Sequence, residues 1–333
     1  MTLVKRANRT LKIICESWPL KRSFAISRDV KTCADVILVE LCEGEVVARA
    51  ECVPYPRYGE SISSVTEQLF KLKKVMESGL SRAELQTTIG PGAARNALDC
   101  VLWDLESKLA KKPIWKIAGI AKLKPVLTAE TISIDSPRAM GLRARELAEA
   151  PILKIKLDSK NIFERLKAIR TNAPKARLII DPNESWNSAL LGPLSSEAAS
   201  LGVEMIEQPM PSNNDNELEL MRASVAICAD ESCHDRSDLE KLVGKYNMIN
   251  IKLDKTGGLT EALALKTKAE EMGFRIMVGC MVATSLAMAP AILIAQGASI
   301  VDLDGPLLLR DDRTPGLEFK GHNVFPAKPE LWG

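Results

Sequence analysis

Three lysines are the residues of this sequence whose types and spacing most suggest chemistry. Lys154 and Lys156 stand two positions apart, and Lys252 follows much later in the chain. Lysines that are buried close together have a lowered pKa, so they can act as bases or stabilise a developing anion. The alternative is a solvated edge strand, on which two like charges on one face are tolerated. The acids between these lysines help to decide between the catalytic site and the solvated edge strand.

Among the acids between Lys156 and Lys252, three come at the ends of expected strands: Asp181, Glu207 and Asp230. Each ends a short apolar run that is typical of a buried strand, although a single acid there is often a helix cap or turn former. Three carboxylates at one rim would repel one another unless a cation lay among them. Oxygen ligands favour Mg²⁺ over zinc, for which the cysteines around Asp230 lack standard spacing. We therefore expect a Mg²⁺ site.

Repeated strand and helix patterns explain how these residues would meet. From residue 125 onward, strand patterns recur every 20–30 residues or so with helical patterns between them, which predicts a parallel sheet. Eight such units favour a (β/α)₈ TIM barrel, whose active site lies at the carboxyl ends of its strands. An open sheet is the alternative, but no Gly-x-Gly-x-x-Gly turn follows the first strand. The strands are expected at Val126–Ile134, Ile152–Leu157, Leu178–Asp181, Met205–Glu207, Ala226–Asp230, Met248–Leu253, Arg275–Gly279 and Ser299–Leu303.

The barrel would place the lysines on opposite sides of one site. Lys156 belongs to the second predicted strand and Lys252 to the sixth, and these strands face each other across a ring of eight. One lysine could remove a proton from carbon on one face while the other returns a proton on the opposite face. A carboxylate-bound Mg²⁺ would stabilise the resulting enediolate. A closed barrel has no free edge, so the solvated-edge interpretation loses its support.

The first part of the chain has a different texture and predicts an α+β capping domain. Strands are expected at Leu11–Glu16, Val36–Cys42 and Val46–Cys52, with helices after them and a basic, polar loop at Pro19–Lys31. We therefore divide the chain into a cap with substrate-specificity loops (1–122), a barrel that carries the catalytic and metal residues (123–304) and a C-terminal segment that returns to the cap (305–333).

Composition restricts partners and compartment. The 45 Lys and Arg residues nearly balance 43 Asp and Glu, so the net charge of +2 gives no indication of binding to nucleic acid or a membrane. The eight cysteines include no Cys-x-x-Cys pair, which favours a reducing, cytoplasmic location. The N-terminal cations Lys5, Arg6 and Arg9 precede too short an apolar run for a signal peptide. The uncharged run 276–301 is long enough to span a bilayer, but two strands joined by a buried helix explain it better.

This combination of residues resembles the muconate-lactonizing subgroup of the enolase superfamily. Lys-x-Lys, three strand-ending acids and a later lysine carry the resemblance, which covers nearly the whole chain and implies an enolase-like fold with its cap. It is greatest to the dipeptide epimerases through Asp302-Leu303-Asp304, where the resemblance implies that both acids bind the free α-ammonium of the substrate. If both lie on the eighth strand, their carboxylates point the same way and can hold one ammonium.

The resemblance also implies roles for the remaining site residues. It assigns acid–base catalysis to Lys156 and Lys252, support of the enediolate to Lys154, and one Mg²⁺ per subunit to Asp181, Glu207 and Asp230. Arg28 and Arg57 are alternative partners for a side-chain carboxylate of the substrate, and Thr131 is a further contact. The basic run Lys21-Arg22-Ser23 departs from the family and leaves side-chain specificity open.

The implied activity is a Mg²⁺-dependent epimerase that inverts the C-terminal residue of L-Ala-D-Glu or L-Ala-L-Glu, in recycling of cell-wall peptides. Another dipeptide, an N-acylamino acid or a cycloisomerisation substrate is the first alternative, and a non-catalytic barrel is the second. The expected partner is a small dipeptide, with neither nucleic acid nor membrane. Assembly into a homo-oligomer and closure of the cap over substrate stay open.

Overall fold

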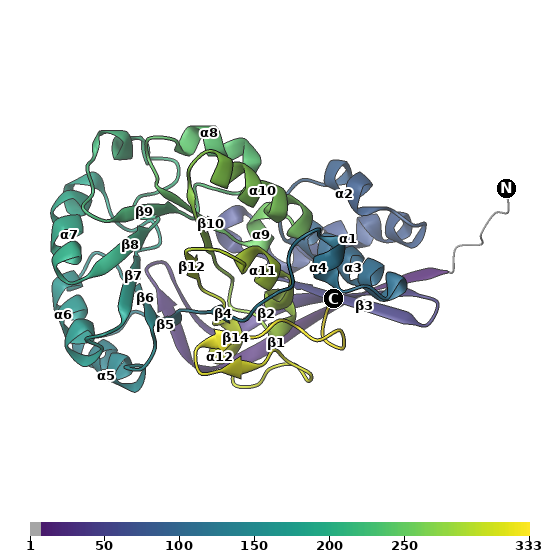
Figure 1. Ribbon diagram of the computed structural model, residues 1–333, viewed down its shortest axis with the longest axis horizontal. Helices are drawn as coiled ribbons and strands as arrows, with labels where there is room; N and C mark the ends of the chain where they lie inside the picture. Colours follow the sequence, from purple (N-terminus) through teal and green to yellow (C-terminus); the bar gives the residue numbers. More distant parts are fainter. Residues whose placement is uncertain (1–7) are drawn as a thin grey trace.

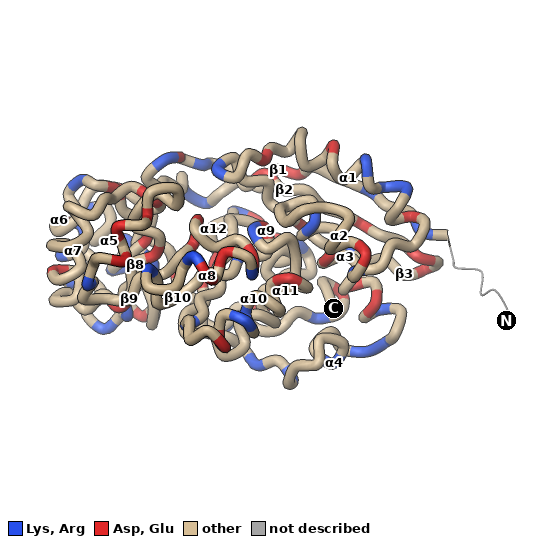
Figure 2. Tube along the Cα trace, turned by 90° about the horizontal axis from the view of Figure 1, so that it is seen from above, with Lys and Arg blue, Asp and Glu red and all other residues tan. Residues whose placement is uncertain are grey.

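The computed structural model describes residues 8–333, so Lys5, Arg6 and the first residues of the predicted cap lie outside the described residues. Figure 1 shows the cap in purple and blue beside a barrel in teal and green. Segments of Lys and Arg are interspersed with segments of Asp and Glu along the trace (Figure 2). The predicted barrel with an α+β cap is confirmed.

The cap consists of an antiparallel sheet covered by helices. Its strands β1 (Arg9–Ile26), β2 (Asp29–Glu43) and β3 (Val46–Cys52) pair in that order. The helices are α1 (Ile62–Glu77), α2 (Arg82–Thr88), α3 (Ala93–Ala110) and α4 (Ile114–Ile117). Serine side chains cap the first two of these helices by accepting a backbone N–H of the first turn. Helix α3 is buried along most of its length, so it forms the centre of the cap.

The predicted loop at Pro19–Lys31 is wrong, because this segment is the outer half of a long hairpin. Phe24 pairs with Lys31 and Ile26 with Asp29, beyond an irregularity in the register between Pro19 and Phe24. Such an irregularity moves side chains to the other face, which hides the period of two. The Ala25 carbonyl accepts the Ile134 N–H at 3.0 Å, so the hairpin arm reaches the barrel.

The barrel contains eight parallel strands in sequence order. They are β5 (Glu130–Ile132), β6 (Ile152–Lys156), β7 (Arg177–Asp181), β8 (Val203–Glu207), β9 (Ala226–Ala229), β10 (Met248–Ile251), β11 (Arg275–Val278) and β12 (Ile300–Val301). The Ala129 N–H donates to the Val301 carbonyl at 2.8 Å, which joins the two ends of the sheet. One buried cluster fills the interior: Ala129, Ile152, Ile179, Met205, Cys228, Met248, Met277 and Ile300.

Helices connect most of these strands on the outside. They are α5 (Pro137–Glu146), α6 (Ile162–Asn172), α7 (Ser188–Ser200), α8 (Leu239–Leu242), α9 (Leu253–Thr256), α10 (Leu259–Glu271) and α11 (Ser285–Ala295). Between β8 and β9, where the strand–helix pattern predicts a helix, the chain forms only a 3₁₀ turn at Asn216–Leu220. The uncharged run 276–301 forms β11, α11 and β12. Within residues 8–333, no helix has the length and apolar character needed to cross a membrane.

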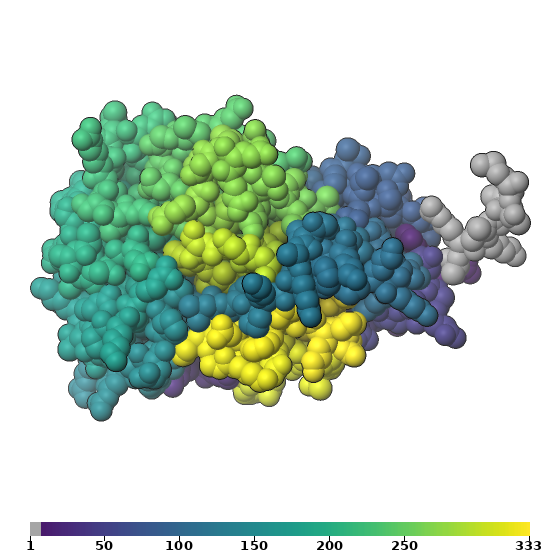
Figure 3. Space-filling view, viewed as in Figure 1, coloured from purple at the N-terminus to yellow at the C-terminus, as the bar shows by residue number. Residues whose placement is uncertain are grey.

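The C-terminal segment crosses from the barrel to the cap, in yellow between the two bodies in Figure 3. It includes α12 (Gly305–Leu308), β13 (Phe319–Lys320) and β14 (Asn323–Val324), which pairs with β4 (Val126–Leu127). The Arg313 guanidinium binds Glu51 of the cap at 2.5 Å. Trp332 is 1% exposed, and its indole N–H donates to the Cys100 carbonyl at 3.1 Å.

We expect Trp332→Ala to lower the free energy of unfolding by about 3–5 kcal/mol, because it leaves a cavity and an unpaired carbonyl in the cap. Chemical denaturation followed by circular dichroism measures this difference. Leu220→Ala is the control, since Leu220 is 89% exposed and its removal should cost less than about 0.5 kcal/mol. Equal stability of the two variants would show that the segment does not hold the cap.

Candidate active site

The predicted site residues meet in one cavity, at the carboxyl ends of the barrel strands beneath the cap hairpin. The cavity has a volume of about 690 Å³, including its open mouth. Its lining includes eight of the predicted residues: Arg28, Thr131, Lys154, Lys156, Asp230, Lys252, Asp302 and Asp304. Asp181 and Glu207 lie against the lysines, fully buried, whereas Arg57 lies on the wall of a neighbouring cavity.

Strand β6 positions the first lysine pair. Pleating alone would send Lys154 and Lys156 to one face, and both are buried there. The Lys156 ammonium lies 2.5 Å from Asp181. The Lys154 ammonium lies 2.7 Å from Glu207 and 2.8 Å from Asp302. The two like charges are therefore held together by carboxylates.

The third lysine stands just after β10. The Lys252 ammonium lies 2.6 Å from Asp230 and 4.0 Å from Glu207. Because β6 and β10 are separated by three strands along the sheet, Lys156 and Lys252 approach the cavity from opposite walls. This is the geometry of two acid–base groups on opposite faces of one carbon atom.

The carboxylates determine the protonation of two lysines. Burial alone would lower the pKa of Lys154, but Asp302, Glu207 and Asp181 outweigh it and raise this pKa well above its usual value. Burial likewise opposes the charge on Lys252, yet Asp230 raises the pKa above its ordinary value. For both lysines the negative charge of the surrounding acids outweighs the effect of burial on the pKa.

The three predicted metal ligands are themselves in unlike states. Burial favours the neutral form of Asp181, but Lys156 and Lys154 outweigh it and lower its pKa to about 2. Burial and the charge of Asp181 raise the pKa of Glu207 to about 7. Despite burial, Lys252 and Lys255 hold the pKa of Asp230 well below its usual value.

The donor set fits a hard divalent cation in chemistry, although lysine ammoniums now hold the space between the acids. Among residues 8–333, no three His, Cys, Asp or Glu side chains stand close enough as they are to bind one metal ion. The Oε2 atom of Glu207 is buried and makes no hydrogen bond within the described chain, despite its ion-pair distance from Lys154. Carboxylate oxygens on three successive strands are ligands that Mg²⁺ prefers. Asp181, Glu207 and Asp230 are the residues that would hold such an ion.

The two acids after β12 face the cavity from the turn that follows the strand, whereas the sequence predicts them on the strand itself. The strand ends at Val301 and Asp304 precedes α12, so the expected shared strand for Asp302 and Asp304 is wrong. Asp302 pairs with Lys154, and the Asp304 carboxylate accepts the Thr131 N–H at 2.7 Å. Burial and the charge of Asp302 raise the pKa of Asp304 to about 7.

One oxygen of this acidic pair is available to a ligand. The Oδ1 atom of Asp302 is buried and has no hydrogen-bond partner among the described residues. A buried carboxylate oxygen without a donor costs free energy, whereas a bound ammonium would satisfy it. The pair is therefore suited to a cationic group at this wall of the cavity.

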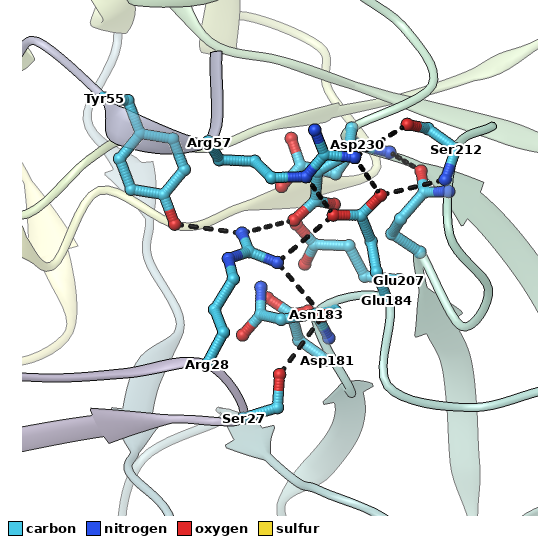
Figure 4. Close-up of polar contacts among 12 residues, drawn as sticks. Ser27, Arg28, Tyr55, Arg57, Asp181, Asn183, Glu184, Glu207, Ser212 and Asp230 are labelled. Atoms are coloured by element: carbon cyan, nitrogen blue, oxygen red, sulfur yellow. Dashed lines mark hydrogen bonds and ion pairs between the residues drawn. The ribbon is translucent and has the colours of Figure 1, made fainter. Parts of the chain in front are cut away.

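Two arginines of the cap approach acids on the barrel loops (Figure 4). Arg28, at the tip of the β1–β2 hairpin, donates to Glu231 at 2.6 Å and to the Tyr55 hydroxyl at 2.9 Å. Arg57 instead forms two hydrogen bonds to Glu184, at 2.6 and 2.7 Å. Arg28 lines the cavity of the lysines, whereas Arg57 lines the neighbouring one.

A strained turn after β7 receives the hairpin tip. Asn183 has a φ of 46° and Glu184 a φ of 67°, values that residues other than glycine rarely adopt. This turn presents the Asn183 carbonyl to Ser27 at 3.1 Å and to Arg28 at 3.0 Å. No pattern in the sequence predicts that contact.

Two further site residues were missed. Lys255 is buried and donates to Asp230 at 2.7 Å, and Asn250 donates to Glu207 at 2.7 Å. Both orient predicted metal ligands. Asn250 stands two positions before Lys252, so strand alternation could have placed it on the same face. Lys255 lies in α9, and the direction of its side chain depends on how the chain turns after β10.

Comparisons with known proteins agree with this geometry. Family models match residues 8–119 as the mandelate racemase/muconate lactonizing enzyme N-terminal domain and residues 139–325 as an enolase C-terminal domain-like unit. The L-Ala-D/L-Glu epimerase of Escherichia coli (strain K12) is 48% identical over 93% of this chain and 98% of its own. An N-acetyl-D-glutamate racemase of Pseudoalteromonas is 43% identical over 90% of this chain and 95% of its own.

A solved structure extends the comparison to three dimensions. An enolase family member from Agrobacterium tumefaciens with homology to dipeptide epimerases, crystallised with sodium and L-Ala-L-Glu, superposes with a TM-score of 0.96. It is 49% identical, and the alignment covers 98% of this chain and all of that one.

Proposed function

This chain belongs to the enolase superfamily, and we propose that it is a Mg²⁺-dependent dipeptide epimerase that inverts the C-terminal residue of L-Ala-D-Glu and L-Ala-L-Glu. The observation that carries the proposal is a single cavity with Lys156 and Lys252 on opposite walls and Asp302 on a third. The similarity to an L-Ala-D/L-Glu epimerase supports the substrate class.

In this proposal, the two lysines exchange the α-proton on one face of the substrate for a different proton on the opposite face. Lys156 or Lys252 removes the α-proton from one face, and the other lysine delivers a proton to the opposite face. Lys154 remains charged beside Asp302 and stabilises negative charge on the substrate carboxylate. A Mg²⁺ ion held by Asp181, Glu207 and Asp230 would supply further positive charge and offset the acids that raise the pKa values of Lys154 and Lys252.

The ends of the dipeptide are bound by residues of opposite charge. Asp302 and Asp304 bind the free α-ammonium, and the Thr131 backbone fixes Asp304 for this task. Arg28 binds the side-chain carboxylate of the C-terminal residue. Arg57 takes a supporting role, since its contacts with Glu184 and Ser212 attach the cap to the barrel.

Racemisation of an N-acylated glutamate is the second candidate, because a relative that is 43% identical is an N-acetyl-D-glutamate racemase. An N-acyl substrate carries no α-ammonium, so it would leave the oxygen of Asp302 without a partner. The acidic pair therefore favours the dipeptide.

The proposed place of action is the cytoplasm, in recycling of cell-wall peptides. All eight cysteines are free thiols in the structure, which supports a reducing compartment. The direct test of function incubates the protein and Mg²⁺ with L-Ala-L-Glu in D₂O and follows the α-proton by NMR. Formation of deuterated L-Ala-D-Glu is expected, and no exchange with any L-Ala dipeptide would refute the assignment.

Removal of divalent metal should abolish epimerisation and also change the folded state. With EDTA, we expect activity to fall by at least about 10²-fold, because the charge that stabilises the transition state is lost. Adding back Mg²⁺ should restore activity and raise the melting temperature, since a ligand that binds only the folded protein stabilises it. Full activity in EDTA, after passage over a chelating resin, would contradict the metal requirement.

A further inference from the structure

Five cationic side chains line the active-site cavity, and four of them are paired with protein carboxylates. The closest partners of Arg28, Lys154, Lys156 and Lys252 lie at 2.5–2.7 Å. Lys31 differs from the other four. Within the described chain, no carboxylate lies at ion-pair distance from its ammonium, which faces the ring of Tyr55 at 5.4 Å from the centroid. A cation in this arrangement can bind an anionic ligand without first losing a carboxylate partner.

The hairpin places Lys31 beside Arg28. Lys31 pairs across the hairpin with Phe24, which also lines the cavity, and the Arg28 guanidinium lies 5.7 Å from the centroid of the same Tyr55 ring. Asp29, two residues before Lys31, also lines this cavity, but it is exposed and its carboxylate accepts the Val30 N–H at 2.8 Å. Both cations thus belong to the cap end of the cavity, and the acidic pair belongs to the end of β12.

Arg28 alone is a poor anion site in this arrangement. Its guanidinium is held by Glu231 at 2.6 Å, and Glu184 lies 3.4 Å away. A substrate carboxylate that approached Arg28 would be repelled by these two acids, and it would share the positive charge of the guanidinium with them. A second cation without a carboxylate partner among the described residues resolves this conflict, because no protein acid neutralises its charge.

We infer that Lys31 is a specificity-determining residue, whose ammonium binds the side-chain carboxylate of the substrate while Arg28 is shared between that carboxylate and Glu231. The inference rests on the proposed function and deepens it. It assigns to the cavity a preference for dipeptides that end in an acidic residue over those that end in a neutral residue of the same size.

The test compares L-Ala-L-Glu with its neutral isostere L-Ala-L-Gln, using the Mg²⁺-loaded full chain. Lys31→Met should raise KM for L-Ala-L-Glu about tenfold or more, since it removes a charge-assisted contact. KM for L-Ala-L-Gln should change by less than about twofold, and Lys31→Arg should keep the preference for Glu. Lys21→Met is the matched control, because Lys21 belongs to the same hairpin but donates to the Leu307 carbonyl and lies on a different cavity.

The outcomes separate this inference from the proposed function. Equal changes for both substrates in Lys31→Met, or no change for either, would overturn the role of Lys31 while epimerisation by the wild type stands. A similar loss in Lys21→Met would show that the general charge of the hairpin matters instead. Absence of epimerisation by the wild-type protein would refute the proposed function and the inference with it.

Discussion

Lys156→Ala and Lys252→Ala are each expected to reduce epimerisation by about 10²–10⁴-fold, and each should abolish α-proton exchange with a different epimer of the substrate. The two ammonium groups lie on opposite walls of the cavity, so each can reach only one face of the α-carbon. A variant that retains one lysine still exchanges the proton on that side but cannot complete inversion. NMR in D₂O, started from L-Ala-L-Glu and separately from L-Ala-D-Glu, measures both properties.

The interpretation requires that the variants fold. Lys156→Ala leaves Asp181 with Lys154 at 3.3 Å, and Lys252→Ala leaves Asp230 with Lys255 at 2.7 Å, so neither buried acid loses all of its compensation. Thermal denaturation should accompany each assay, with exposed Lys12→Ala as the control. If both variants exchange both epimers as fast as the wild type, two-base catalysis by these lysines is excluded.

Asp302→Asn is expected to raise KM for L-Ala-L-Glu by about 10²-fold while affecting N-acetyl-glutamate much less. The substitution keeps the shape of the side chain but removes the charge that holds an ammonium, and only the dipeptide has one. Because Asp302 also contacts Lys154, a shared fall in kcat for both substrates is expected. The ratio of kcat/KM between the two substrates is therefore the informative quantity.

Asp311→Asn is the matched control for this experiment, since Asp311 is exposed and pairs only with its neighbour Arg310 in the described residues. It should leave the ratio unchanged. Equal losses for the dipeptide and the N-acyl substrate in Asp302→Asn would mean that the acidic pair does not select an ammonium. In that case racemisation of N-acylated glutamate becomes the better assignment.

The sequence was sufficient where function follows from local pattern. Lys156 and Asp181 could be placed because each ends a short apolar strand, and parallel strands bring their carboxyl ends to one rim. The hairpin arm was missed because its pairing depends on a distant partner, and the irregular register before Phe24 hides the alternation.

Other parts of the site depend on contacts between segments that lie far apart in the sequence. Asp302 was assigned to a strand, but β12 has only two paired residues, so the chain turns before it. Lys31 lies in the run for which the sequence predicts a loop, and its suitability for binding an anion depends on the residues around it in the fold. Its lack of a carboxylate partner is a property of the folded cavity rather than of the hairpin sequence.

The course of the C-terminal segment bears on how the cap could be exchanged between related enzymes. Arg313 binds Glu51, and Trp332 lies against the Cys100 carbonyl, so part of the cap interior is supplied by residues that follow the barrel. A chimera that transplants only the N-terminal cap would therefore join two mismatched halves of one core. A transplanted cap should therefore fold only when residues 313–333 come from the same donor. Replacement of the hairpin arm alone should not need this exchange.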